Sequence, residues 1–130
     1  MKRIEKKFLI NDTLTSIVVI IESVEANLIE TIRLIDKEVQ NKSSLYEIVC
    51  IDNTGAAEDN KVYKKIRRAI PRACFIYLSK QYTPDIALTV GVDSCIVDYV
   101  IFYDLSTDNP DLIDTFLDQL LRGYDIVIGY

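Results

Sequence analysis

The sequence predicts a single α/β domain, a three-layer α/β/α Rossmann-like arrangement with a mostly parallel sheet. Three observations predict it. Short β-branched runs alternate with helical periods, the connections between them are short, and 130 residues include only four Gly and three Pro. Strict alternation of strands and helices is typical of parallel sheets covered by helices on both faces. An apolar content of 49% is sufficient for a core between these layers.

The first half of the chain predicts three strands separated by two helices. β-branched runs of strand length mark the strands, and apolar residues three and four positions apart mark the helices. The second helix carries its acids at the start and its bases towards the end, as the helix dipole favours, and Pro71 ends it. In order, these elements are expected at residues 16–21, 28–39, 45–51, 58–70 and 73–78.

The second half predicts two more helices and two more strands. Residues 83–85 read Thr-Pro-Asp, an N-cap followed by a first-turn proline and an acid, and open a helix. This helix carries the apolar residues Ile86 and Val90 and the neighbouring Leu88 and Val92. Residues 109–111 read Asn-Pro-Asp and open another helix in the same way. The strands are expected at residues 99–103 and 125–128. Residues 1–13 precede this single domain, which spans residues 1–130, as a basic extension.

Histidine and cysteine usage excludes several kinds of site. The chain has no His, which excludes Ser-His and Cys-His nucleophiles and histidine-ligated zinc. Cys50, Cys74 and Cys95 lie far apart in apolar segments, so we interpret them as reduced core residues of a cytoplasmic protein. The longest apolar run, residues 17–21, is too short for a membrane span, so none is predicted.

Charge is distributed unevenly along the chain. The formal net charge is −5, yet residues 61–80 contain seven bases and no acid, and residues 85–130 contain nine Asp and one Arg. An acidic chain of this kind is a poor binder of nucleic acids, so no nucleic-acid partner is predicted. We interpret the basic cluster as a solvated helix face rather than a groove for phosphates.

Polar residues directly follow three of the predicted strands. In such sheets the binding crevice lies beyond the carboxyl ends of the strands, where the strand order reverses. A single Asp in this position is also a common turn former, but two at one sheet edge predict a shared acidic crevice. The candidates are Glu22 and Ser23 after the first strand, Asp52 and Asn53 after the second, and Asp104 and Ser106 after the fourth.

Three stretches of the chain together resemble the nucleotide-binding half of the family 2 inverting glycosyltransferases, which have the GT-A fold. Residues 16–28 are similar to the family's opening strand and first helix, and residues 46–53 resemble its second strand, which normally ends in two aspartates. Residues 98–112 resemble the strand that carries the metal-binding D-x-D and the helix after it. Residues 123–130, Gly-Tyr-Asp-Ile-Val-Ile-Gly-Tyr, are similar to the polyprenyl-phosphate sugar transferase branch.

The resemblance implies a domain that binds a UDP- or GDP-linked sugar. The transfer would move a hexose to a glycan or lipid-phosphate acceptor, as in cell-envelope polysaccharide biosynthesis, with Mg²⁺ or Mn²⁺ as cofactor. It implies that Asp52 contacts the base or ribose beside Asn53 and that Glu22 lies by the base. It also implies that Asp104 holds the metal, with Ser106 as a weaker ligand.

The sequence departs from the family's pattern at functional positions. The second aspartate after the second strand is Asn53, and the D-x-D reads Asp104-Leu105-Ser106. The resemblance places the acceptor half and the catalytic base beyond Tyr130, so no catalytic residue is assigned and we expect the chain to be a piece of a longer protein. We therefore expect a glycosyltransferase domain that is impaired or inactive as an isolated chain.

Two other functions are compatible with parts of the sequence. The first is a non-catalytic, degenerate GT-A module that acts in partner binding or regulation, which the missing acids favour. The second is a response-regulator receiver, which fits the chain length. We reject the receiver because it needs an acidic pair after the first strand and a Lys after the fifth, and because Asp52 follows the second strand rather than the third.

The resemblance also predicts an open sheet edge. In the GT-A fold the strand order is 3-2-1-4-6-5-7, so the fifth strand is not expected beside the fourth. Open apolar edges recruit other strands. Either the fifth strand moves in beside the fourth, or a second molecule covers the edge; we expect the second outcome, a homodimer.

Overall fold

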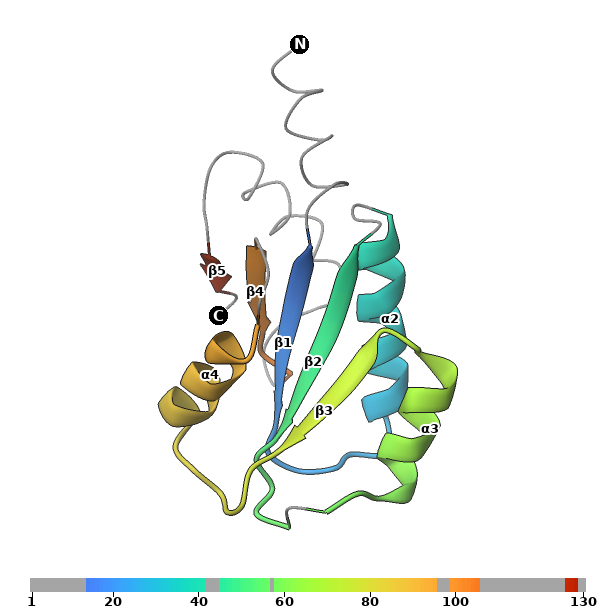
Figure 1. The fold of residues 1–130 in the computed structure, drawn as a ribbon. Coiled ribbons are helices and arrows are strands. Elements are labelled where there is room, and N and C mark those ends of the chain that lie inside the picture. Colours follow the sequence, from blue (N-terminus) through green and yellow to red (C-terminus); the bar gives the residue numbers. More distant parts are fainter. Residues whose placement is uncertain (1–13, 42–44, 57, 96–98, 106–125, 129–130) are drawn as a thin grey trace.

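The computed structural model describes residues 14–41, 45–56, 58–95, 99–105 and 126–128. The predicted alternation of strands and helices is confirmed within these ranges. The extension over residues 1–13 and the helix expected after residue 109 lie outside them. The elements are β1 (Thr15–Ile21), α2 (Leu28–Gln40), β2 (Tyr46–Asp52), α3 (Lys61–Ala69), β3 (Ala73–Tyr77), α4 (Pro84–Asp93), β4 (Tyr99–Tyr103) and β5 (Ile126–Ile128) (Figure 1).

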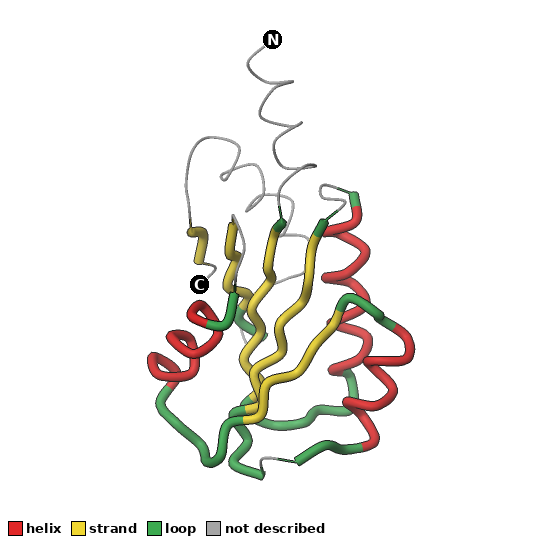
Figure 2. The backbone as a smooth tube through the Cα atoms, viewed as in Figure 1, coloured by secondary structure: helices red, strands yellow, loops and turns green. Residues whose placement is uncertain are grey.

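The five described strands form one sheet in the order β3-β2-β1-β4-β5, and every neighbouring pair is parallel. The chain builds the sheet outward from β1 to β3 and then returns to place β4 on the other side of β1 (Figure 2). The strand order therefore reverses between β1 and β4. With helices on both faces, this is the predicted Rossmann-like α/β fold.

β5 lies directly beside β4, with Ile101 opposite Val127. The expectation of an open edge on β4 is therefore wrong, because the fifth strand of the same chain pairs there. Of the two outcomes considered, the sheet takes the one that needs no second molecule. The homodimer stays a prediction, but this edge no longer supplies a reason for it.

α2 and α3 cover one face of the sheet. Tyr63 and Ile66 of α3 are fully buried against it. α3 begins after its N-cap Asn60, whose side chain accepts a hydrogen bond from the backbone N–H of Tyr63, so the acids expected inside this helix precede it. α2 buries the four residues whose spacing predicted it, Leu28, Ile32, Ile35 and Val39.

α4 covers the other face and approaches the sheet through small residues. Ala87 and Gly91 are its buried positions, whereas Ile86 is 47% exposed. A Cβ atom at Gly91 would lie 2.7 Å from Cγ1 of Val18, so no side chain fits there without displacing the sheet. Ile86 therefore does not face the core, whereas Val90 is half-buried and packs against it together with Leu88 and Val92.

The three cysteines lie in different surroundings. Cys50 is buried, and burial raises the pKa of its thiol. Cys95 is half-buried, and Cys74 is exposed on β3, which is an edge strand. The interpretation as core residues is correct for Cys50 and wrong for Cys74, which is exposed although its strand neighbours Phe75 and Ile76 pack against the core. Among the described helices, none has the length and apolar character needed to cross a bilayer.

Candidate functional site

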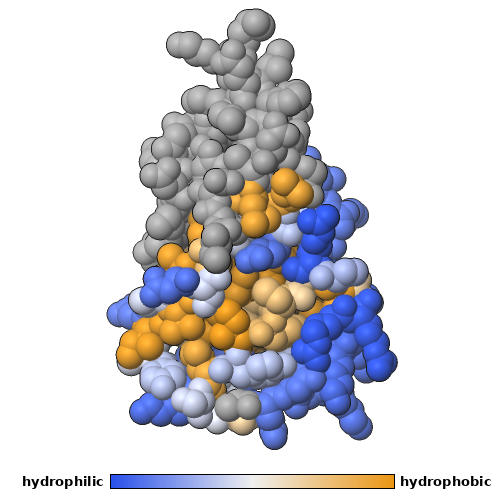
Figure 3. All heavy atoms as spheres, viewed as in Figure 1, coloured by the Kyte–Doolittle hydropathy of each residue, from blue (hydrophilic) through white to orange (hydrophobic). Residues whose placement is uncertain are grey.

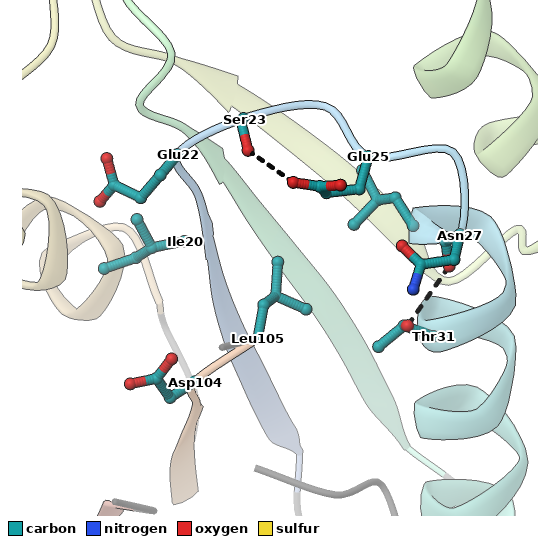
Figure 4. A pocket seen from close by; sticks show the side chains of 9 residues that line it. Ile20, Glu22, Ser23, Glu25, Asn27, Thr31, Asp104 and Leu105 are labelled. Atoms are coloured by element: carbon teal, nitrogen blue, oxygen red, sulfur yellow. Dashed lines mark hydrogen bonds between the residues drawn. The ribbon is translucent and has the colours of Figure 1, made fainter. Parts of the chain in front are cut away.

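A pocket of about 340 Å³ lies at the carboxyl ends of β1 and β4. Ile20, Glu22 and Ser23 line it from the end of β1, and Asp104 and Leu105 line it from the end of β4. The start of α2 closes the remaining side, and Figure 4 shows it opposite the two strand ends. The pocket therefore occupies the point at which the strand order reverses, which is where sheets of this kind bind ligands.

The pocket is lined by three carboxylates. Figure 4 shows Glu22 and Asp104 on one side of it and Glu25 on the other, above the first turn of α2. Glu25 accepts a hydrogen bond from the hydroxyl of Ser23 at 3.1 Å. An anion cannot approach three carboxylates without a cation between them, and oxygen ligands of this kind suit hard divalent cations.

The start of α2 adds uncharged polar side chains and a helix N-terminus to the lining of the pocket. Asn27 is the N-cap residue, and its side chain makes no capping hydrogen bond to the helix. Thr31 donates its hydroxyl to the carbonyl of Asn27, and both residues line the pocket. A helix N-terminus carries partial positive charge, so the α2 side of the pocket combines a helix dipole with the Glu25 carboxylate, opposite Glu22 and Asp104.

Asn53 is fully buried and holds Glu22 in place. Its side-chain N–H₂ donates to both carboxylate oxygens of Glu22 at 3.1 Å and to the carbonyl of Tyr82 at 2.9 Å. Its side-chain oxygen accepts from the backbone N–H of Tyr82 at 2.8 Å. Gln81 adds a longer hydrogen bond to Glu22. An amide supplies both the donors and the acceptor used here, whereas an ionised aspartate only accepts, which explains an Asn where the resemblance expects an aspartate.

Asp52 does not line the pocket. It is 1% exposed, and its Oδ1 accepts hydrogen bonds from the Tyr63 hydroxyl at 3.0 Å and from the Thr54 N–H at 3.2 Å. Oδ2 is buried without a protein partner. Burial and the hydrogen bond to Asp52 raise the pKa of the Tyr63 hydroxyl, which therefore remains a donor at neutral pH. Asp52 thus links the end of β2 to α3.

The structure brings together two of the predicted site residues, Glu22 and Asp104, and places Asn53 directly behind Glu22. It does not bring Asp52 into their pocket, because Asp52 pairs with α3 instead. Ser106 lies outside the described residues. These contacts therefore do not form the shared crevice that was predicted for Asp52 and Asp104.

Sequence reasoning missed the wall of the pocket that α2 supplies. Glu25, Asn27 and Thr31 lie just before and inside the first turn of that helix. The signal available was an Asn directly before the first apolar residue of a helical period, since Asn is a preferred N-cap residue. A helix that starts shortly after the central strand has its N-terminus beside the reversal point.

A divalent cation would find the carboxylates of Glu22 and Asp104 in the lining of the same pocket. Within the described ranges, no group of three or more Asp, Glu or Cys side chains is arranged to hold a metal ion. Mg²⁺ in nucleotide sites is usually held by one or two carboxylates together with phosphate oxygens and waters. Glu22 and Asp104 fit that second arrangement, in which the ligand completes the coordination.

No protein-family model matches this chain, and no curated protein sequence matches it either.

Proposed function

We propose that this chain is a glycosyltransferase-like domain that binds a nucleotide-sugar donor in the pocket between β1 and β4. The observation that carries the proposal is the place of the pocket. It lies where the strand order reverses, with Glu22 and Asp104 lining it from two neighbouring strand ends. Ligands of parallel α/β sheets bind at this point.

The walls of the pocket suit a diphosphate that arrives with Mg²⁺ or Mn²⁺. Such a cation neutralises the diphosphate and bridges it to carboxylates. Asp104 and Glu22 would hold the cation, and the hydrogen bonds from Asn53 fix the position of the Glu22 carboxylate. The N-terminus of α2 lies on the opposite wall, where N–H groups and the helix dipole favour phosphate oxygens.

Under this proposal the domain supplies donor binding for transfer of a hexose from a UDP- or GDP-linked donor. The acceptor would be a glycan or a lipid phosphate, and the cellular setting would be cytoplasmic synthesis of cell-envelope polysaccharide. No residue of the chain is assigned as the catalytic base. Asp52 would act indirectly, by fixing the end of β2 against α3, rather than by contacting the nucleotide.

Calorimetric titration tests the proposal. UDP- and GDP-hexoses are titrated into the full chain with Mn²⁺ or Mg²⁺ and again with EDTA. Binding is expected only with the metal, and Asp104→Asn should weaken it by about tenfold or more. Asp93→Asn makes the same chemical change at an exposed position on α4 and should leave the affinity unchanged. Equal affinity with EDTA would overturn the role given to the carboxylates.

A non-catalytic module is the second candidate function. The observation that favours it is that Asp52 and Asn53, two positions expected to contact the nucleotide, are both buried in hydrogen bonds within the protein. In that case the fold would serve partner binding or regulation. Absence of binding to any of the donors, with either metal, would favour this candidate over the first.

Self-association is also part of the proposal, as a homodimer. β3 is an outer strand of the described sheet, and outer strands can pair with another chain. Sedimentation equilibrium at micromolar concentration tests it. A mass equal to that of one chain at every concentration would exclude the dimer.

A further inference from the structure

α3 carries a dense group of exposed cations on the side that faces away from the sheet. We call Lys61, Lys64, Lys65 and Arg68 the α3 basic surface; all four side chains are exposed. The opposite side of the same helix is apolar, with Tyr63 and Ile66 fully buried. Figure 3 shows the resulting hydrophilic region over the part of the molecule where α3 lies in Figure 1.

The charges of this surface are not balanced by the described residues around them. Arg67 is the α3 cation that forms an ion pair, with Asp59, and it also donates to the Tyr77 hydroxyl. For the four residues of the α3 basic surface, no ion pair with another described residue is found. Their charge therefore faces solvent.

The arrangement also opposes helix formation. Lys61 lies three and four positions before Lys64 and Lys65, and Lys64 lies four before Arg68, so like charges are neighbours on the helix surface. The first turn holds no acid and begins with a lysine, against the helix dipole. An external layer of negative charge relieves all of these repulsions at once.

We propose that the α3 basic surface docks the domain onto an anionic lipid bilayer. The surface is the convex outer side of a helix, so it presents its charges to a plane rather than around a groove. Three of its four cations are lysines, compact point charges that suit diffuse attraction better than bidentate recognition of single phosphates. Its apolar side is buried, so the attachment is electrostatic and involves no insertion into the acyl chains.

The charge distribution of the whole chain favours a bilayer over a nucleic acid. Residues 61–80 contain seven bases and no acid, whereas residues 85–130 contain nine Asp and one Arg. An acidic chain is a poor binder of nucleic acids in general. A local group of exposed lysines is nevertheless attracted to an anionic leaflet over about one Debye length.

Vesicle flotation with the full chain tests this inference, and it needs no nucleotide, so its outcome is independent of the proposed function. Vesicles of phosphatidylcholine mixed with phosphatidylglycerol are compared with vesicles of phosphatidylcholine alone. Binding is expected only to the anionic vesicles and should be lost in high salt. Each basic residue of the surface changed to Gln should lower partitioning by about fivefold.

The variant and its control are chosen to separate docking from folding. Lys61→Gln, Lys64→Gln and Lys65→Gln are combined, and partitioning should fall by about a hundredfold. Gln is a good helix former and the change removes repulsion, so the melting temperature should stay equal or rise. Lys80→Gln removes a charge outside the surface, where Lys80 lies over the Tyr82 ring, and should change partitioning by less than about twofold.

Four results would overturn the inference. The unaltered chain could fail to bind anionic vesicles, or could bind both kinds of vesicle equally. The triple variant could bind as well as the unaltered chain, or the unaltered chain could bind a single-stranded RNA oligonucleotide more tightly than anionic vesicles at the same salt concentration. The last result would assign the α3 basic surface to a nucleic acid instead.

Discussion

Asp52 ends the parallel strand β2 and Asp104 directly follows β4, but their side chains lie in different surroundings. Asp52 is 1% exposed and accepts a hydrogen bond from Tyr63 of α3. Asp104 is half-buried and lines the pocket beside the end of β1. Register explains the difference. Asp52 is opposite Ile21, and Tyr103 is opposite Val19, so Asp52 and Tyr103 lie on the same face of the sheet. Asp104 comes one residue after Tyr103 and therefore alternates to the other face. The face of the sheet on which an aspartate lies thus decides its surroundings: Asp52 contacts α3, and Asp104 lines the pocket.

The largest expected effect comes from Asn53→Asp. The change removes three donated hydrogen bonds and places a carboxylate against that of Glu22 and the carbonyl of Tyr82. We expect the free energy of unfolding to fall by about 3 kcal/mol, measured by urea denaturation. Asn60→Asp is the control, because Asp caps a helix as well as Asn does, and it should cost less than about 0.5 kcal/mol.

The same substitution at both aspartates tests the comparison directly. Asp52→Ala leaves the buried Tyr63 hydroxyl and the Thr54 N–H without their acceptor, and should cost about 2 kcal/mol. Asp104→Ala removes one of three carboxylates from a solvent-accessible pocket and should cost less than about 1 kcal/mol. Equal losses in thermal unfolding would mean that the two aspartates do not differ in structural role.

A smaller effect is expected from removing a single hydroxyl, by Tyr63→Phe. Its loss deprives the buried Asp52 of one of its two hydrogen-bond donors and should lower the free energy of unfolding by about 1 kcal/mol. Tyr77→Phe is the matched control. Its hydroxyl contacts the exposed Asp59 and Arg67, where each contact contributes little, and the loss should be under about 0.5 kcal/mol.

The predicted pH dependence is absent at neutral pH and develops in alkali. Burial raises the pKa of Tyr63, as does its bond to Asp52, while burial and the Asp36 carboxylate raise the pKa of Tyr46 to about 12. In the unfolded chain both hydroxyls ionise near pH 10. The folded state then holds more protons, so stability is present below pH 10 and falls as pH rises towards 12. Denaturation midpoints at several pH values should show this fall, and Tyr63→Phe should reduce it.

Local patterns in the sequence predicted the elements well, because each depends on residues close together in the chain. The period of Leu28, Ile32, Ile35 and Val39 placed α2 and its buried side correctly. α4 shows the limit: Ile86 and Val90 share a helical spacing, yet Ile86 is exposed and the buried positions of the helix are Ala87 and Gly91. How closely a helix approaches a sheet depends on both partners, and no window of sequence contains both.

The candidate site was predicted in part for the same reason. The ends of strands are local features, so Glu22 and Asp104 could be found as neighbours of apolar runs. The burial of Asp52 depends on Tyr63, which belongs to the next helix, and that contact has no signal at either position alone. Likewise the partner of the Asn53 side chain is the backbone of Tyr82, which any residue type provides.

The central position of β1 has a consequence for the order in which the molecule is built on the ribosome. Ile17 pairs with Ile48 on one side and with the much later Ile101 on the other. The three-stranded part from β1 to β3 is therefore synthesised complete while β4 is still to come, and closing the long loop to β4 is the slower step. The ribosome makes the Glu22 wall of the pocket before the Asp104 wall. A ligand that contacts both walls can therefore bind only once β4 has joined the sheet, and its binding opposes the loss of β4 from the sheet.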